Sequence, residues 1–312
     1  MDILVFGGAG FIGKHLCSRL VRQGHRVRAF NKQPSFGGWP DIAGVEWLSG
    51  DFTNPEETAS ALEGAEVIFH LVSTTLPKSS NDDPCLDLKE NVASTLHLLD
   101  SVVGMKRSPK IVFVSSGGTV YGIPQQIPIS ENHPTDPICA YGVGKLAIEK
   151  YLLLYRYLHN LDYRILRMAN PYGEYQPVHS GQGAIPVFLN KALKGEVLEI
   201  WGDGSVVRDY VYIGDAIDSA IKIMNYEGDQ RIFNIGSGRG YSLNDLTQMI
   251  GELLGQRIAC RYFSSRPFDV PVNVLDITLA KNELDWIPDT PLPVGLQKML
   301  EYMGCCIESG NK

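Results

Sequence analysis

The sequence predicts an α/β protein in which helices cover both faces of a parallel sheet. Short apolar runs alternate with helical patterns from the first residues to about residue 166, and such alternation is typical of doubly wound sheets. The first run ends in glycines, as expected of a buried strand that turns sharply into a helix. Strands are expected at 2–6, 27–30, 45–48, 67–72, 110–115 and 163–166, and helices at 11–23, 55–62, 86–103 and 141–160.

Three glycines follow the first predicted strand with the spacing G-x-x-G-x-x-G, at Gly7, Gly10 and Gly13. The first two allow a tight turn and a close backbone approach to a pyrophosphate, and Gly13 lets the next helix pack on the strand. The positive end of that helix, at Phe11 and Ile12, would face the phosphates. A merely flexible turn is the alternative, but the strand before it and the helix after it favour a Rossmann-type dinucleotide site.

The end of the second predicted strand bears on the choice between NAD and NADP. An acidic residue commonly binds the adenosine ribose there, whereas this chain has Asn31 followed by Lys32. Asparagine does not repel a 2′-phosphate, and Lys32 or Arg28 could attract one, so NADP stays possible beside the favoured NAD. After the third strand, Asp51 could accept from the adenine amine, with Phe52 beside it, or Asp51 could cap the next helix.

Tyr141 and Lys145 lie four residues apart at the start of a predicted helix. This spacing places both side chains on one helix face, with Cβ atoms about 5–6 Å apart. A lysine ammonium favours the phenolate, so Lys145 is expected to lower the pKa of Tyr141 and to let it exchange a proton near neutral pH. Beside a bound nicotinamide, such a pair would remove or return a hydroxyl proton while hydride moves.

Composition argues against several other classes of protein. The chain has 312 residues, 44% of them hydrophobic and 20% charged, with a formal net charge of −7 and no basic run. These values are typical of a globular protein whose partner is not nucleic acid. No apolar stretch reaches the length of a membrane span and no signal peptide is recognised, so a cytoplasmic location is expected. The six cysteines are scattered, and neither a disulfide framework nor a metal site is expected.

A series of short motifs runs nearly end to end along the chain. It comprises, in order, the glycine turn, Gly50-Asp51, Asn91-Val92, and the segments 114–122, 141–145, 167–173, 201–204, 208–211, 234–238 and 266–269. The series resembles the extended short-chain dehydrogenase/reductase family and, more narrowly, its NAD-dependent sugar-nucleotide epimerases and dehydratases, such as the UDP-glucose/UDP-galactose 4-epimerases. The order of the motifs is far more specific for the family than for the reaction.

The resemblance implies roles for individual residues. Tyr141 would be the catalytic acid/base, and Lys145 would bind the nicotinamide ribose. Cofactor-binding residues would be Gly7, Gly10, Phe11, Ile12, Gly13, Asn31, Lys32, Asp51, Phe52, Leu71, Asn91, Ser115, Tyr141, Lys145 and Met168. Substrate-binding residues would be Thr119, Asn170, Arg208, Tyr210, Arg266 and Asp269. Guanidinium forks suit a diphosphate, although Arg208 could instead pair with Asp209, and Arg266 could be a solvated loop residue.

The segment after the fifth predicted strand separates the reactions of the family. Its 4,6-dehydratases carry an Asp-Glu pair where this chain has Gly118 and Thr119, so that reaction is not expected. Its galactose epimerases often carry a third serine where this chain has Gly117. Ser116 and Thr119 are the candidates for that catalytic hydroxyl, although Ser116 could bond only backbone at the strand end.

Three hypotheses about function follow from the resemblance. The first is an NAD-dependent 4-epimerase of a nucleotide-diphosphate sugar, of UDP-hexose or UDP-N-acetylhexosamine type, that acts through a transient 4-keto sugar. The second is an NAD(P)H-dependent reductase of a nucleotide-linked 4-keto-6-deoxy sugar, which Asn31 slightly favours. The third is a nucleotide-sensing protein without catalysis, and the intact pair Tyr141 and Lys145 argues against it.

Two domains are expected. A dinucleotide-binding Rossmann domain would span 1–169, rejoined by a segment near 205–235, and a smaller substrate-binding lobe would comprise 170–204 and 236–312, because glycine and proline become frequent after Asn170. The helices 86–103 and 141–160 carry apolar stripes, which in this family often form a four-helix homodimer core. Each stripe could equally pack on its own sheet. The resemblance also implies a place in polysaccharide biosynthesis.

Overall fold

The computed structural model describes residues 1–34, 38–75, 79–178, 183–265 and 270–310, with side chains described as far as Gly304. These residues form two compact units, each considered by itself. Unit 1 comprises Met1–Gly122, Thr135–Arg167 and Ile217–Phe233, and unit 2 comprises Ile123–Pro134, Met168–Ala216 and Asn234–Lys312.

The unit boundaries differ from the expected domains at two places. The returning segment of unit 1 is shorter than 205–235, and residues 123–134 belong to unit 2 although they lie inside the expected domain 1–169. Ile129 explains the second difference, because its backbone bonds to Val274 and Asp276 at 2.8 Å each. Its carbonyl also accepts from Asn234 Nδ2 at 2.8 Å. Contacts this distant in sequence leave no local pattern.

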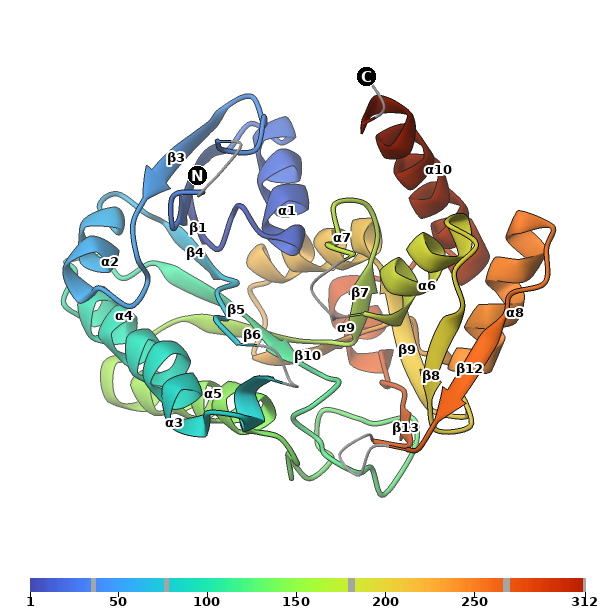
Figure 1. The fold of residues 1–312 in the computed structure, drawn as a ribbon. Helices are drawn as coiled ribbons and strands as arrows, with labels where there is room; N and C mark the ends of the chain where they lie inside the picture. Colours follow the sequence, from blue (N-terminus) through green and yellow to red (C-terminus); the bar gives the residue numbers. More distant parts are fainter. Residues whose placement is uncertain (35–37, 76–78, 179–182, 266–269, 311–312) are drawn as a thin grey trace. The chain divides into compact units, whose positions relative to one another are not determined.

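A seven-stranded sheet has the order β10-β6-β5-β4-β1-β2-β3 (Figure 1). Its strands are β1 (Asp2–Phe6), β2 (Arg26–Asn31), β3 (Val45–Ser49), β4 (Val67–His70), β5 (Lys110–Ser116), β6 (Tyr163–Met168) and β10 (Ile232–Ile235). The strand order reverses at β1, which pairs in parallel with both β2 and β4. The predicted doubly wound parallel sheet is therefore confirmed, and ligands of such sheets bind where the order reverses.

Helices cover both faces of this sheet (Figure 1). One face carries α1 (Phe11–Arg22) and α7 (Ile213–Met224), and the other carries α2 (Pro55–Ala61), α4 (Ser94–Val103) and α5 (Ala140–His159). An ion pair between Arg19 and Asp218 joins α1 to α7. Among the helices that the structure describes, none combines the length and the apolar character needed to cross a membrane.

The expected helix 86–103 is helical throughout, but it is not α-helical throughout. The chain forms α3 (Pro84–Asp87), then a π-helix at Leu88–Ala93, and then α4. Within the π-helix, the Asn91 carbonyl accepts from the Thr95 hydroxyl at 2.6 Å. A π-turn inside a helix is uncommon and is frequently found at functional sites.

A buried ion pair attaches α5 to the sheet. Arg167 of β6 donates from Nη2 to Glu149 Oε2 of α5 at 2.6 Å and from Nη1 to the Tyr121 hydroxyl at 3.0 Å. Ser115 of β5 donates to Glu149 Oε1 at 2.5 Å. All four side chains are buried. The hydroxyl of Ser115, expected at the cofactor, is therefore occupied in holding α5 against the strands.

Unit 2 contains two small sheets and a core of its own. In one sheet, β9 (Val207–Tyr212) pairs with β7 (Asn170–Tyr172), β11 (Gly240–Ser242) and β13 (Val272–Asn273), and in the other β8 (Leu198–Trp201) pairs with β12 (Cys260–Phe263). Its helices are α6 (Ala184–Leu193), α8 (Leu243–Leu254), α9 (Thr278–Leu284) and α10 (Leu292–Gly310). Aromatic and aliphatic side chains of α6, α8, α10, β8 and β9 form this core.

Replacing Arg167 by Met leaves the Glu149 carboxylate buried without its counter-charge. We expect Arg167→Met to lower the free energy of unfolding by about 3–5 kcal/mol, the usual cost of breaking a buried ion pair. Urea denaturation followed by circular dichroism measures the loss. The double variant Glu149→Gln/Arg167→Met removes both charges and is expected to recover most of it. A single variant as stable as the wild type would contradict the role given to this pair.

Candidate functional site

The glycine turn between β1 and α1 leaves no room for side chains. A Cβ atom on Gly13 would lie 2.3 Å from the Gly7 carbonyl oxygen, and Gly7 itself has a φ of +87°, which favours glycine. The helix α1 begins after Gly10 without a side-chain cap and without an acidic residue in its first turn. Its first N–H groups, at Phe11 and Ile12, therefore suit a pyrophosphate. The turn fits a dinucleotide.

Asn31, at the end of β2, supports this turn directly. Its Oδ1 accepts from the backbone N–H of Ala9 at 2.8 Å. The carboxamide oxygen is thus engaged by the protein, and the Nδ2 donors remain for a ribose hydroxyl. No local pattern predicts this contact, because it joins residues 22 positions apart.

The basic side chains considered for a 2′-phosphate are engaged with carboxylates. Lys32 Nζ lies 2.9 Å from Asp51 Oδ2. Arg28 is buried and donates from Nε to Asp2 Oδ1 at 3.0 Å, so the expectation that Arg28 could attract the phosphate is wrong. Burial acts to raise the pKa of Asp51, but hydrogen bonds from Thr53 and Lys32 outweigh it and lower the pKa. Asp51 therefore stays charged beside Lys32.

The apolar residues expected at the cofactor occupy different surroundings. Leu71, directly after β4, lies against the turn, because a Cβ on Gly7 would come within 3.3 Å of it. Phe52 is buried, with its ring 4.9 Å from that of His70, so its ring belongs to the core of unit 1. Met168, the last residue of β6, is also buried.

Tyr141 and Lys145 share one face of α5, as the spacing predicts. Lys145 Nζ lies 5.6 Å from the centroid of the Tyr141 ring and donates to the Val114 carbonyl of β5 at 3.0 Å. The lysine is buried, and this burial lowers its pKa to about 8, although nearby carboxylates oppose the shift. An ammonium with this pKa is mostly charged at neutral pH and begins to lose its proton just above neutral pH.

The expected lowering of the Tyr141 pKa is wrong for the protein alone. Burial raises the pKa of this phenol, Cys139 and Asp87 add to the rise, and a hydrogen bond with Ser73 opposes it. Because the Lys145 ammonium lies over the ring and donates to a carbonyl, it does not reverse the shift. Spacing along a helix predicted the proximity correctly but carried no information about burial.

The two candidate hydroxyls differ in their surroundings. Ser116 ends β5, and its carbonyl accepts from the Val120 N–H at 3.1 Å. Thr119 lies at the start of α5, because a Cβ on Gly142 would come within 3.2 Å of the Thr119 Cβ. The Thr119 Oγ1 is buried and has no hydrogen-bond partner in the part of the chain that the structure describes. Buried hydroxyls are normally paired, so a ligand or a tyrosine hydroxyl would complete this one.

The Asn91 side chain is engaged on both sides. Its Oδ1 accepts from the Thr74 N–H at 3.0 Å, and its Nδ2 donates to Asp87 Oδ1 at 3.1 Å. The amide, expected to line the cofactor, therefore shapes the loop that follows β4.

Apart from Thr119, which belongs to unit 1, the substrate candidates that the structure describes lie in unit 2. Asn170 donates from Nδ2 to the Asp209 carbonyl at 3.0 Å, and Arg208 donates from Nη1 to the Val270 carbonyl at 2.6 Å. Tyr210 is buried in the core of the unit, and burial raises its pKa to about 12. Its ring therefore packs inside the unit.

Two substrate candidates lie outside the described residues, and the Asp209 carboxylate, considered as a partner of Arg208, has other partners. Arg266 and Asp269 lie outside the described residues. The buried carboxylate of Asp209 accepts from Ser237 N at 2.6 Å and from Gly238 N at 3.1 Å. The motif 234–238 thus wraps this carboxylate, and a Cβ atom on Gly236 would lie only 2.4 Å from Asp209 Oδ2.

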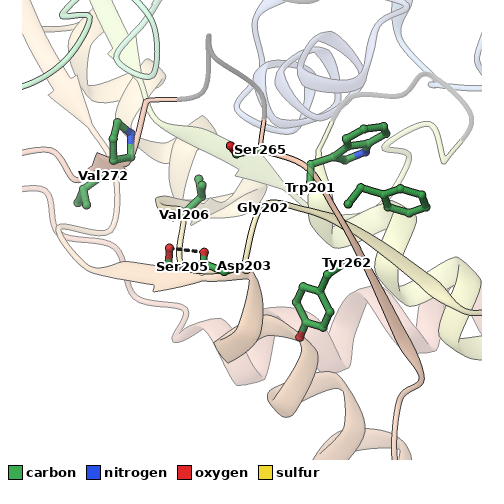
Figure 2. Close-up of a pocket in the computed structure, with 10 residues that line it drawn as sticks. Trp201, Gly202, Asp203, Ser205, Val206, Tyr262, Ser265 and Val272 are labelled. Atoms are coloured by element: carbon green, nitrogen blue, oxygen red, sulfur yellow. Dashed lines mark hydrogen bonds between the residues drawn. The ribbon is translucent and has the colours of Figure 1, made fainter.

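Unit 2 also contains a cavity of about 1020 Å³ with aromatic walls (Figure 2). The rings of Trp201 and Phe263 stack with centroids 5.0 Å apart, and Tyr262 donates to Asn244 Oδ1 at 3.2 Å. Trp201 is 40% exposed and Tyr262 52%, so flat aromatic surface is open to a ligand. The lining residues are Trp201, Gly202, Asp203, Ser205, Val206, Tyr262, Phe263, Ser265, Pro271 and Val272. Sequence reasoning did not single out Trp201 or Phe263, which line this cavity, although Trp201 belongs to the motif 201–204.

Comparisons with known proteins agree with this geometry. The model of the NAD dependent epimerase/dehydratase family matches residues 3–236. The UDP-glucose 4-epimerase of Mycolicibacterium smegmatis is 34% identical over 310 residues, which cover 97% of this chain and 98% of that protein. The dTDP-4-dehydro-6-deoxyglucose reductase of Escherichia coli is 31% identical over 312 residues, which cover 97% and 98%. A solved UDP-glucose 4-epimerase of Thermotoga maritima with UDP-glucose has a TM-score of 0.92 at 33% identity, covering 98% of this chain and 100% of that one. The chain belongs to the NAD-dependent epimerase/dehydratase family.

Proposed function

We propose that this protein is an NAD-dependent 4-epimerase of a UDP-linked sugar, of hexose or N-acetylhexosamine type. The observation that carries the proposal is the pair Tyr141 and Lys145 on one face of α5, with the orphaned Thr119 hydroxyl at the start of that helix. Full-length similarity to a UDP-glucose 4-epimerase at 34% identity supports it.

The cofactor is NAD, the cofactor of the family. The glycine turn and the start of α1 would hold its pyrophosphate, Asn31 Nδ2 would donate to the adenosine ribose, and Leu71 would contact it beside the turn. When bound, NAD supplies the acceptor and donor of hydride. The ion pair of Lys32 with Asp51 weakens the case for a 2′-phosphate, because the positive charge is already partnered.

The proposed chemistry uses three side chains of unit 1. Tyr141 takes the proton of the sugar 4-hydroxyl as that carbon is oxidised, and later returns a proton to the 4-keto oxygen. Thr119 Oγ1 bonds the sugar oxygen or the phenol oxygen, which satisfies a hydroxyl that is otherwise buried without a partner. Lys145 supplies a positive charge that favours phenolate once the site is complete. No reagent is consumed, because the 4-keto sugar is reduced again on its other face.

We further propose that unit 2 binds the nucleotide of the substrate. A nucleobase would lie against the exposed aromatic surface of Trp201 and Tyr262. Arg208, on the strand that follows the lining residue Val206, would meet the diphosphate, since guanidinium groups suit phosphate geometry. Asn170 would contact the sugar.

A reductase of a nucleotide-linked 4-keto-6-deoxy sugar is the second candidate. The 31% identity to the Escherichia coli reductase favours it specifically. It would use the same Tyr141 and Lys145, but the reduced cofactor would be consumed in each turnover.

An exposed apolar surface on α3, α5 and the π-helix supports a homodimer, which we also propose. Its residues, with exposed fractions, are Leu86 (44%), Leu88 (59%), Val143 (54%), Leu153 (54%), Leu154 (43%), Tyr157 (86%) and Leu158 (57%). Apolar patches of this kind commonly mark protein interfaces. We expect the dimer to act in the cytoplasm, on sugars destined for polysaccharides.

Replacing Tyr141 by Phe removes the proposed acid/base while retaining the ring. We expect the rate of UDP-glucose to UDP-galactose conversion, or of the N-acetyl pair, to fall at least about 100-fold in Tyr141→Phe. Chromatography of the nucleotide sugars measures it. Tyr157→Phe, on the exposed side of the same helix, is the matched control and should keep full activity.

The cofactor that survives purification separates the two candidate functions. Denaturing the fresh protein is expected to release near-stoichiometric NAD, as a recycled cofactor requires. Mass spectrometry identifies it. An empty protein that binds NADPH more tightly than NADH would instead support the reductase.

Charges placed on the exposed surface of α5 should separate the subunits. We expect wild-type protein to show twice the chain mass of 34.4 kDa in light scattering, and Leu153→Glu/Tyr157→Glu to show the single-chain mass. Ile287→Glu changes an exposed apolar residue of unit 2 and is the control. A wild-type protein that stays monomeric at working concentration would overturn the dimer proposal.

A further inference from the structure

Asp87 is a buried carboxylate to which neither the family resemblance nor the proposed reaction gives a role. It ends α3 and is 3% exposed. Its Oδ1 accepts from the Thr75 hydroxyl and from Asn91 Nδ2, the latter at 3.1 Å. No cation forms an ion pair with it within the described ranges of the chain. Both donors therefore meet the same oxygen of the carboxylate.

The other carboxylate oxygen of Asp87 faces α5. A Cβ atom on Gly144 would lie 3.0 Å from Asp87 Oδ2. Gly144 directly precedes Lys145, so the acid packs against the helix turn that carries the lysine. A larger residue at this position would push the carboxylate away from the helix by a few tenths of an ångström.

The other groups around Lys145 are already neutral or compensated. Glu149, one turn further along α5, also acts to raise the pKa of Lys145, but less than Asp87 does, and it is paired with Arg167 at 2.6 Å. His70 of β4 is neutral, because burial and the Lys145 charge lower its pKa to about 3. Tyr141 is protonated in the protein alone, because its pKa is raised. Among these neighbours, Asp87 is the uncompensated anion.

We propose that Asp87 is the counter-charge that keeps the buried Lys145 ammonium protonated beside Tyr141. It is thus a positioning residue that acts through Lys145, and its effect on turnover rests on the proposed function. Without it, the desolvated lysine would lose its proton at a lower pH, since burial disfavours the charged form. The same negative charge raises the pKa of Tyr141, so removing it should shift the ionisation of both groups toward lower pH.

The ionisation of Lys145 can be followed without any catalysis. We would label lysine Cε with ¹³C, identify the Lys145 signal by its absence in Lys145→Arg, and titrate it by NMR. The wild-type midpoint is expected near pH 8. In Asp87→Asn it should fall by about 1 unit, the lower end of the effect of one opposite charge nearby. Asp83→Asn is the matched control, because Asp83 is exposed and caps the helix that Asp87 ends. Asparagine caps helices as well as aspartate does, so this change removes only a charge.

The pH dependence of activity tests the inference independently. In Asp87→Asn, both limbs of the pH–rate profile of epimerisation should move to lower pH, which a merely structural role would not cause. A Lys145 midpoint unchanged in a folded Asp87→Asn protein, or moved equally in Asp83→Asn, overturns the inference. Should Asp87→Asn fail to fold, Asp87→Ser tests the same loss of charge with a smaller side chain.

The two proposals fail in different ways. A Lys145 midpoint that falls as expected, in a protein that converts no nucleotide sugar, would uphold the counter-charge and reject the epimerase. An active epimerase whose Lys145 midpoint is unchanged in Asp87→Asn would uphold the epimerase and reject the counter-charge.

Discussion

The buried ion pair between Glu149 and Arg167 holds the helix on which the proposed proton transfer depends. It joins the middle of α5 to β6, and Ser115 of β5 adds a third contact. Lys145 lies one turn and Tyr141 two turns before Glu149 on the same helix, so this attachment limits how far they can move relative to the strand ends. Burying two charges costs desolvation free energy. Hydrogen bonds from Arg167 of β6 and Ser115 of β5 offset that cost and hold the helix in one position on the sheet.

Lys145 is likewise a buried charge held by neighbouring groups. Lys145 is buried, bonded to the Val114 carbonyl, and packed near the aromatic face of Phe113 at 4.8 Å. A charge in such surroundings is sensitive to every neighbouring carboxylate, which links the π-helix and the end of α3 to the chemistry on α5. The irregular helix after β4 therefore contributes to the electrostatics of this region through Asp87, as well as to its shape.

Local features of the sequence predicted what depends on local patterns. The strands, the glycine turn and the shared helix face of Tyr141 and Lys145 follow from periodicity and spacing, and the structure confirms them. The π-helix was not predicted, because it involves contacts of Asn91 with a loop 16 or 17 residues away. The predicted direction of the pKa shift of Tyr141 was wrong for a related reason, because burial depends on the folded chain and not on local spacing. Arg28, which sequence alone left open as a phosphate ligand, proved to be a core residue paired with Asp2.

The contact between Asn31 and Ala9 has a consequence for redesigning the cofactor preference. Residue 31 ends β2, the place where a Rossmann fold commonly holds the adenosine ribose. In this protein its carboxamide oxygen also supports the backbone of the glycine turn. A change there would alter pyrophosphate binding and ribose selectivity together. Engineering is better directed at Lys32 and Asp51, whose ion pair is exposed enough to be rearranged without disturbing the turn.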